Sequence, residues 1–511
     1  MLLSHGVYYI NNKMSLKFQT HSNEPMSDTP LWRRTTAWML AALACLILFI
    51  AATYHLRESP AIWYDEGYYT QAAMNLSEIG HQALQLAPGR YISTAFVTVG
   101  YPLIYPVSVF YHLFGAGVAE GRAVMVLFIF GFAAVSYALV RKLFGGWTAA
   151  WTLLYLSSFP MLYGNGKSVL GEVPGLFYLV LALLALWYLE RTQYRNWRGY
   201  AVLGVAAGLC AVTKPIFILF LAALFLTLVI RWRRTPLQWS GSVLGLVALG
   251  LPVLMWLYLQ FGFGDSWHSV VSAYANPYAV EDLTSVILQN ALRFFTESTP
   301  IYTMVLMAVW GASLALKRRY KDASSAELAA FIFCVLIILA YLRLEGWYRY
   351  FFPATMTALL FFPYACSTVF NYIAERLRFL RRVPWLPYLF IIALIAAQLY
   401  QLARTSYVAD YYHSTRTRDL TAQIESFGPE ASFFLYNTPE VAVLLPSRNY
   451  YQYLEPSGHL NFGADEVSVL QKGTADVVIV YDNTYRQREK LFSKYTLAES
   501  VNRYDFLKRR Q

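Results

Sequence analysis

Charged residues are scarce in this sequence. Only 14% of the 511 residues are Asp, Glu, Lys or Arg, whereas 57% are hydrophobic; a soluble domain usually carries about 25% charged residues. A chain with so little charge cannot cover a folded surface with water-facing groups. Apolar runs of about 20 residues recur along most of it, and each is long enough to cross a bilayer. The composition therefore predicts a polytopic integral membrane protein.

Cysteine is also scarce. The 4 cysteines all lie inside apolar runs, at Cys45, Cys210, Cys334 and Cys366. None remains for a disulfide in a water-exposed region, and their spacing is not that of metal ligands. We interpret them as small apolar packing residues. Because ten-residue segments of alternating hydrophobicity are missing too, we expect helical spans rather than a β-barrel.

About eleven helical spans are predicted. The first follows about thirty polar residues and is about 20 residues long, which is too long and too far inside the chain for a cleaved signal sequence. We therefore expect an uncleaved first span. The predicted spans lie near residues 35–55, 121–141, 147–163, 172–190, 199–213, 215–231, 240–261, 300–316, 326–342, 350–370 and 385–403.

Lysine and arginine predict how these spans are oriented. The net charge of +11 gathers in every second loop, and short basic loops stay in the cytoplasm. This distribution explains the positive charge without nucleic acid as a partner. It places the N-terminus inside and the C-terminus outside. The basic segments are 33–34, 141–142, 191–198, 231–234, 317–321 and 376–382.

Three parts of the chain are expected from these patterns. Residues 1–34 form a cytoplasmic tail, and residues 35–403 form an all-α membrane domain. Its long outer loop, 57–120, has two stretches that read as helices in the membrane interface. Residues 404–511 lose the long apolar runs. They contain the strand-like segments "ASFFLYN" and "DVVIVY", which predict a small extracytoplasmic α/β domain.

The charges that approach the membrane gather at the predicted outer face. Carboxylates there could take a proton from a hydroxyl or hold a divalent metal. Arginine and lysine could bind a phosphate. Such a set suits a substrate with a lipid tail and a phosphate. The candidates are Asp65, Glu66, Lys167, Glu172, Lys214 and Arg349, accompanied by Arg122, Arg343 and Glu345.

Asp65 and Glu66 cannot face the same point on a helix, because neighbours point about 100° apart. We expect one at the reacting centre and the other orienting or binding. Simpler interpretations exist for each residue. An Asp-Glu pair or a lone Glu172 can be solvated loop acids, and Arg349 can anchor the membrane interface. Lys167 and Lys214 can extend their charges towards water.

The order of several motifs strengthens the functional interpretation. The segments "WYDEGYYTQAAMNL", "GYPLIYPVSVFYHLFG", "GRAVMVLFIFGFAAVSYALVRKLFG", "GKSVLGEVPGLFYL", "GLCAVTKPIF" and "WYRYFFPA" follow one another. Together, over residues 61–364, they resemble the GT-C membrane glycosyltransferases that use polyprenyl-phosphate sugars. This superfamily includes the protein O-mannosyltransferases and the lipid A aminoarabinose transferases.

The resemblance implies an inverting transfer of a sugar from a polyprenyl phosphate. The family's acidic motif matches Asp65 and Glu66, with the aspartate as the usual base. Its second acidic position matches Glu172, and its late basic residue matches Arg349, at the donor phosphate. Lys214 matches a recurrent Lys-Pro, and both Lys214 and Lys167 are taken as further donor-phosphate candidates beside Arg349. Some relatives bind a divalent metal, so a metal cofactor is left open.

The resemblance also has limits that bear on the substrate. The family's second acidic residue is often Asp, and here it is Glu172. The aminoarabinose transferases carry a lysine before a proline pair, where this chain reads Thr98-Val99-Gly100-Tyr101-Pro102. A lipid, a polymer or a protein therefore all stay open as acceptors, in what we expect to be a bacterial plasma membrane. The alternatives are a transporter or flippase for a lipid-linked sugar, and a non-catalytic receptor or assembly protein.

Overall fold

The structure is a computed structural model that describes residues 30–95, 97–232, 237–261, 282–317, 323–344, 346–377, 379–457, 460–462 and 466–510. Several segments singled out in the sequence lie outside these described residues. They are most of the expected N-terminal tail, parts of three basic loops (233–234, 318–321 and 378) and Glu345.

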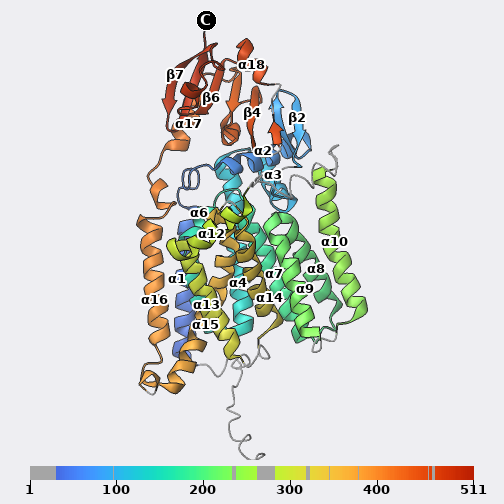
Figure 1. Ribbon diagram of the computed structural model, residues 1–511, viewed down its shortest axis with the longest axis vertical. Helices are drawn as coiled ribbons and strands as arrows, with labels where there is room; N and C mark the ends of the chain where they lie inside the picture. Colours follow the sequence, from blue (N-terminus) through green and yellow to red (C-terminus); the bar gives the residue numbers. More distant parts are fainter. Residues whose placement is uncertain are drawn as a thin grey trace, which may run out of the picture.

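A bundle of apolar helices makes up most of the molecule (Figure 1). Every predicted span falls on the helices of this bundle, but two are divided: 147–163 where Pro160 begins a new helix, and 215–231 between a short 3-10 helix, η2 (Pro215–Ile218), and α9 (Leu219–Arg231). The helices are α1 (Leu31–Thr53), α4 (Val118–Phe144), α5 (Gly146–Ser157), α6 (Pro160–Gly166), α7 (Glu172–Arg191), α8 (Trp197–Thr213), α9 (Leu219–Arg231), α10 (Trp239–Phe261), α13 (Ser298–Leu316), α14 (Ser325–Tyr341), α15 (Phe352–Arg376) and α16 (Leu386–Arg404).

The helix lengths agree with an integral membrane protein. In the described residues, 7 helices are long and apolar enough to cross a membrane, and shorter apolar helices at Trp197–Thr213, Pro215–Arg231 and Ser325–Tyr341 accompany them. The expected count of about eleven spans stays a prediction. Because nearly all backbone groups of these segments bond within their own helix, they can lie in lipid without unpaired polar groups.

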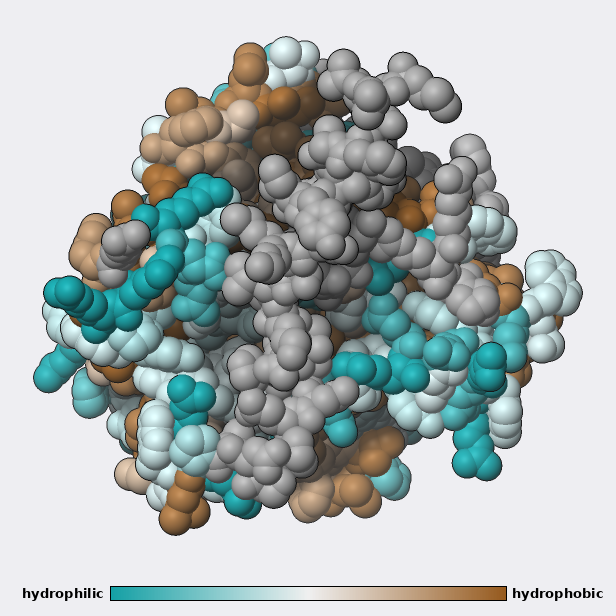
Figure 2. All heavy atoms as spheres, turned by 90° about the horizontal axis from the view of Figure 1, so that it is seen from below, coloured by the Kyte–Doolittle hydropathy of each residue, from teal (hydrophilic) through white to brown (hydrophobic). Residues whose placement is uncertain are grey.

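Ion pairs join the helix ends at the end of the bundle that carries the basic loops. Arg231 of α9 contacts Glu190 of α7 at 3.1 Å, and Lys317 after α13 contacts Glu327 of α14 at 2.8 Å. Glu190 also accepts hydrogen bonds from the backbone and hydroxyl of Ser325, at 2.8 and 3.0 Å. Figure 2 looks at this end, where hydrophilic side chains gather on the left and right and apolar surface lies at the top and bottom edges.

The opposite end carries the first loop. Its predicted helices are confirmed as α2 (Tyr64–Ile79) and α3 (Tyr101–Phe114). In Figure 1, α2 lies between the bundle and the C-terminal sheet. Two further elements were not predicted from the sequence: the hairpin of β1 (Ala83–Ala87) with β2 (Arg90–Ser93), and the helix α12 (Leu283–Thr296).

The C-terminal residues form a six-stranded mixed sheet in the order β5-β4-β3-β6-β8-β7. The two predicted strands are confirmed as β3 and β6, which pair in parallel at its centre. The expected boundary at residue 404 is not tested. The strands are β3 (Phe433–Tyr436), β4 (Tyr450–Ser457), β5 (Leu460–Phe462), β6 (Val477–Tyr481), β7 (Tyr495–Val501) and β8 (Tyr504–Arg509), with helices η7 (Pro439–Leu444), α17 (Arg416–Glu425), α18 (Val467–Lys472) and α19 (Thr484–Gln487).

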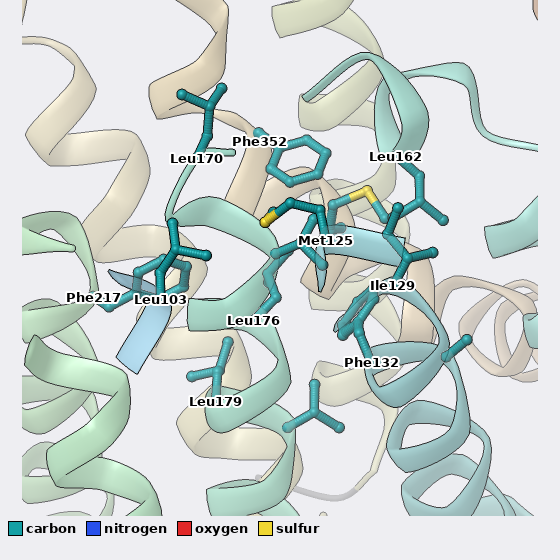
Figure 3. Close-up of a cluster of buried hydrophobic side chains, with 14 of the residues drawn as sticks. Leu103, Met125, Ile129, Phe132, Leu162, Leu170, Leu176, Leu179, Phe217 and Phe352 are labelled. Atoms are coloured by element: carbon teal, nitrogen blue, oxygen red, sulfur yellow. The ribbon is translucent and has the colours of Figure 1, made fainter. Parts of the chain in front are cut away.

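A dense apolar core packs α3 of the first loop against the helices of the bundle (Figure 3). Its side chains come from α3, α4, α6, α7, α15 and the short helix η2 (Pro215–Ile218), so six segments are locked together at this point. Close packing of this kind transmits small shifts rather than absorbing them. It therefore holds the polar residues above it in place. Fully buried members are Leu103, Met125, Ile129, Phe132, Leu162, Leu176, Leu179, Phe217 and Phe352.

Candidate active site

The neighbouring acids at the start of α2 have different surroundings. Glu66 is buried, with 1% of its surface exposed. Both its oxygens accept hydrogen bonds of 2.8 Å from the guanidinium of Arg122 on α4. It also accepts hydrogen bonds from the backbone N–H groups of Val169, at 3.0 Å, and Trp63, at 3.2 Å. A carboxylate with four donors in this arrangement is fully occupied.

Arg122 extends this contact to the loop before α2. Its Nη1 donates to the carbonyl oxygens of Leu56 and Pro60, at 3.0 and 2.8 Å. Its Nη2 also donates to the carbonyl of Ala61, at 3.4 Å. One buried arginine thus fastens the end of the first membrane helix and the start of α2 to α4. Since arginine offers five donors in a rigid fork, lysine could not make the same set of contacts.

Asp65 points elsewhere and forms an ion pair with Arg349, which lies just before α15. Aromatic rings surround this guanidinium. Its central carbon lies 6.0 Å from the ring centre of Trp63, 5.8 Å from Trp347 and 5.3 Å from Tyr350. Such rings attract a cation and shield it from water. The pair is still 16–24% exposed, measured on the two side chains, so a ligand can reach it.

A second ion pair joins Glu172 at the start of α7 to Lys214 between α8 and η2. Both side chains are buried, with 1% and 6% exposed. Burial lowers the pKa of Lys214, although the negative charges of Glu172 and Asp65 oppose this effect. The lysine ammonium is a compact point charge with three donors, so Lys214 can contact a bound anion while it keeps its contact with Glu172.

The two pairs lie close enough to influence each other. Burial lowers the pKa of Arg349, but the negative charges of Asp65 and Glu172 raise it above its ordinary value. Tyr69 of α2 lies near both acids. Burial and the Asp65 charge raise its pKa well above the usual range, so its hydroxyl stays neutral. Asp65, Glu172, Lys214, Arg349 and Tyr69 therefore form one polar cluster above the apolar core.

Two buried atoms in this cluster have no hydrogen-bond partner in the described part of the chain. They are Nε of Arg349 and Oε2 of Glu172. Buried polar groups are nearly always paired in native proteins, so an unpaired donor and an unpaired acceptor need an explanation. A bound ligand that accepts from one and donates to the other would supply the missing partners.

Not every predicted site residue joins the cluster. Lys167 is fully buried and donates to the carbonyl oxygen of Tyr54 at 2.7 Å. Burial and the nearby charge of Arg122 lower its pKa to about 7. It thus belongs with the Glu66–Arg122 contact rather than with Arg349. Arg343 is exposed to solvent.

Close backbone approaches position the cluster. A side chain on Gly67 would place its Cβ 2.3 Å from the backbone nitrogen of Glu440 in η7. A side chain on Gly100 would meet the carbonyl oxygen of Val212 at 2.1 Å, just before Lys214. Only glycine allows both contacts. They bring α2 onto the C-terminal domain and the first loop onto the end of α8.

The C-terminal domain makes further contacts with α2. Gln71 donates to the carbonyl oxygen of Pro439 and to Gln452, both at 2.9 Å. Tyr64 donates to Asn437 at 2.6 Å. No residue of this domain was predicted from the sequence to belong to the site. Gly67, inside the "DEGYY" segment, is the local signal that another backbone approaches α2 closely. That backbone belongs to Glu440, which lies 373 residues further along the chain (440 minus 67).

The metal that the family resemblance left open can be judged from the donor groups. Among the described residues, no three His, Cys, Asp or Glu side chains gather as a metal site. Asp65 and Glu172 would be the natural ligands, but each already faces a cationic side chain. Divalent cations prefer several unshared oxygen ligands. This donor set does not fit a divalent metal.

Comparison with known proteins supports the resemblance. Residues 103–256 match the family described as dolichyl-phosphate-mannose-protein mannosyltransferase. The chain is 26% identical over 226 residues to undecaprenyl phosphate-alpha-4-amino-4-deoxy-L-arabinose arabinosyl transferase 1 of Pseudomonas fluorescens (strain Pf0-1). That match covers 42% of this chain and 38% of the relative, so it spans well under half of the relative's length.

The fold is shared over most of the chain. The structure is similar to ArnT from Cupriavidus metallidurans bound to undecaprenyl phosphate, with a TM-score of 0.60, 17% identity, and coverage of 93% of this chain and 98% of that one. It is also similar to the oligosaccharyltransferase AglB from Archaeoglobus fulgidus in complex with an inhibitory peptide and a dolichol-phosphate. There the TM-score is 0.51, with 12% identity and coverage of 88% and 70%. These likenesses confirm the predicted fold, an apolar helical membrane bundle with a small C-terminal sheet domain.

Proposed function

We propose that this protein is an inverting glycosyltransferase that moves a sugar from a polyprenyl phosphate to an acceptor hydroxyl. The observation that carries the proposal is the pair of adjacent ion pairs, Asp65–Arg349 and Glu172–Lys214. They lie together at one end of a membrane bundle whose fold is shared with ArnT. Such a site offers a base and two phosphate-binding cations side by side.

Arg349 and Lys214 are the proposed donor-phosphate ligands. The unpaired Nε of Arg349 supports this assignment, because a phosphate oxygen could accept its hydrogen bond. A solved structure of similar fold was obtained bound to undecaprenyl phosphate. Lys167 is left out of the donor site because it is buried against the Tyr54 carbonyl. Glu172 holds Lys214 in place and offers its second oxygen to a sugar hydroxyl.

The proposed reaction is a single displacement. When the donor phosphate binds Arg349, this arginine exchanges one anionic partner for another, and the Asp65 carboxylate becomes free. Asp65 then takes the proton of the acceptor hydroxyl while the acceptor oxygen bonds to the anomeric carbon. The bond between that carbon and the phosphate oxygen breaks on the opposite side, which inverts the configuration. The polyprenyl phosphate leaves as an anion, and Arg349 and Lys214 stabilise its charge.

Glu66 receives a different role in this proposal. Its four hydrogen bonds leave it no oxygen for a substrate. We assign it as a positioning residue that fixes the first turn of α2 and thereby aims Asp65. This division of roles agrees with the expectation that neighbouring helical residues serve different purposes.

The reaction is assigned to the outer face of the membrane. The basic helix ends lie at the end of the bundle opposite α2, and basic loops stay in the cytoplasm. Lipid-linked donors are held in the bilayer, so a site at the membrane surface can receive both the donor and an acceptor from outside. The acceptor, whether lipid, polymer or protein, and the bacterial plasma membrane as location both remain part of the proposal.

Envelope mass spectrometry tests the proposal. A strain without the gene is compared with strains that carry the native chain or Asp65→Asn, which keeps the shape but cannot take a proton. We expect one sugar to vanish from a lipid, polymer or protein on deletion, to return with the native chain, and to stay absent with well-expressed Asp65→Asn. Full restoration by Asp65→Asn would refute the proposed base and favour a transporter of a lipid-linked sugar.

A further inference from the structure

A hollow opens between α7 and α8 at the end of the bundle far from the candidate active site. Its volume is about 270 Å³, and it is lined mainly by apolar and aromatic side chains, including Leu181, Leu184, Trp187 and Val202, with Arg198 at the rim. The helices meet closely at Gly199, where a Cβ would lie 2.8 Å from the side chain of Leu189. The hollow lies beside this contact, on the surface of the bundle.

Three cations lie at or near the hollow: Arg198 lines it, and two others lie close to Trp187, one of its lining residues. The side-chain nitrogen of Lys142 on α4 and the guanidinium of Arg191 on α7 each lie 5.7 Å from the ring centre of Trp187. Arg198 on α8 completes the set. All three are exposed. Within the described part of the chain, none of them forms an ion pair with a carboxylate, so their charges are available to an anion from outside the protein.

This site is separate from the proposed transferase site. Glu172 begins α7 and Arg191 ends it, and a helix of 20 residues is about 30 Å long. The hollow is therefore at the level of the other membrane surface. Arg231 and Lys317, whose ion pairs join the neighbouring helix ends, lie at this same end.

We propose that the hollow binds one anionic phospholipid from the leaflet at the basic end of the bundle. The lipid phosphate lies between Arg198, Arg191 and Lys142, and one acyl chain fills the apolar hollow beside Trp187. Charge complementarity selects this occupant, because one cation that lines an apolar hollow and two beside its Trp187, none in an ion pair with a described carboxylate, match an anionic headgroup on a hydrocarbon tail. Basic pockets between helices on the cytoplasmic side commonly bind such headgroups. The proposal does not depend on the transferase activity.

Native mass spectrometry of the full chain tests it. The protein is released from nanodiscs that contain equal amounts of phosphatidylglycerol and phosphatidylcholine with identical acyl chains, and the lipids that stay bound are counted. Each basic residue near an anionic lipid is worth about fivefold in affinity, so the double variant Arg191→Gln with Arg198→Gln should lower retention of phosphatidylglycerol by about thirtyfold. The matched control is the double variant Arg33→Gln with Arg34→Gln, which replaces two exposed arginines at the start of α1.

A second variant separates a built site from a merely basic surface. Val202→Trp keeps every charge but fills the hollow, and Val202 is 48% exposed, so the larger side chain does not disturb the core. We expect it to lower phosphatidylglycerol retention as well. If Val202→Trp retains the lipid, or the control variant loses as much as the double variant, the proposal is wrong. Equal retention of both lipids by the native chain would also overturn it.

Discussion

Glu66 and Arg122 form a buried bidentate ion pair, with two hydrogen bonds of 2.8 Å between them. The pair joins the first turn of α2 to the second long membrane helix. The adjacent Asp65 makes no part of it and contacts Arg349 instead. Two neighbouring carboxylates thus divide into one that holds the architecture and one that a substrate can reach. This division leads to separate predictions for the two residues.

Glu66→Gln should destabilise the protein strongly. The amide leaves the Arg122 charge buried without a counter-charge, which typically costs about 3–5 kcal/mol. Denaturant-induced unfolding in detergent measures the loss. Glu78→Gln is the matched control, because Glu78 pairs with Arg448 on the surface with 47% of its side chain exposed. Exposed pairs contribute at most about 1 kcal/mol. Equal losses in the two variants would contradict the structural role of Glu66.

The proposed donor-phosphate role of Arg349 predicts that its variants weaken the binding of a polyprenyl phosphate, with undecaprenyl phosphate as the probe. Charged hydrogen bonds contribute about 1.5–3 kcal/mol, so Arg349→Met should lower affinity by about 10- to 100-fold. Arg349→Lys should restore only part of it, because lysine lacks the planar fork. Titration of the purified protein with the lipid measures this. Arg343→Gln, an exposed arginine six residues earlier (349 minus 343), should leave the affinity unchanged.

Asp65→Asn should separate binding from chemistry. Without its carboxylate partner, Arg349 is free for the phosphate, so undecaprenyl phosphate should bind at least as tightly as to the native chain. Sugar transfer should fall by about 100- to 10,000-fold, the usual contribution of a general base. The same titration and the envelope analysis measure the two effects. A parallel loss of lipid binding would show that Asp65 acts in donor recognition instead.

Lys167 should make stability depend on pH. Its pKa is lowered to about 7 in the folded protein, first by burial and then by Arg122, from an ordinary value of about 10.4 in the unfolded chain. Between these values the unfolded chain holds a proton that the folded chain has released, so stability rises with pH. Below pH 7 Lys167 is protonated in the folded chain too, so the destabilisation caused by burying its charge has its full value.

Lys167→Met removes this titration. The free energy of unfolding of the variant should exceed that of the native chain most below pH 7. This difference should shrink steadily towards pH 10. Thermal unfolding of both proteins across this range gives the difference, which cancels the titration of all other groups. A difference that stays constant with pH would refute the lowered pKa of Lys167.

Gly67→Ala should impair transfer through the C-terminal domain. The added Cβ would lie 2.3 Å from the Glu440 backbone, so α2 must move away from η7 and carry Asp65 with it. Misplacement by about 1 Å can cost about 100-fold in rate. Gly250→Ala is the control, since a Cβ there meets nothing within 4 Å. Unchanged transfer in Gly67→Ala would mean that the C-terminal domain does not position the site.

Local patterns in the sequence were sufficient for the membrane helices. Each span is an apolar run of roughly bilayer length, and this property belongs to a single segment. The strands β3 and β6 were likewise visible as short apolar runs. In contrast, α12 and the β1–β2 hairpin carry mixed polar and apolar residues, and their structure depends on neighbours that are distant in the sequence. Neither α12 nor the β1–β2 hairpin could therefore be predicted from local sequence patterns.

The sequence by itself determined a polytopic helical membrane protein, a mixed C-terminal domain and a set of charges that includes Asp65, Glu172, Lys214 and Arg349. Only the tertiary structure decided which charges meet. Asp65 pairs with Arg349 across 284 residues, and Glu66 pairs with Arg122 across 56. Burial removes the water that would otherwise solvate each charge, so a buried charge must find a partner wherever packing places one. Which residues form ion pairs therefore depends on helix packing and cannot be predicted from a local motif.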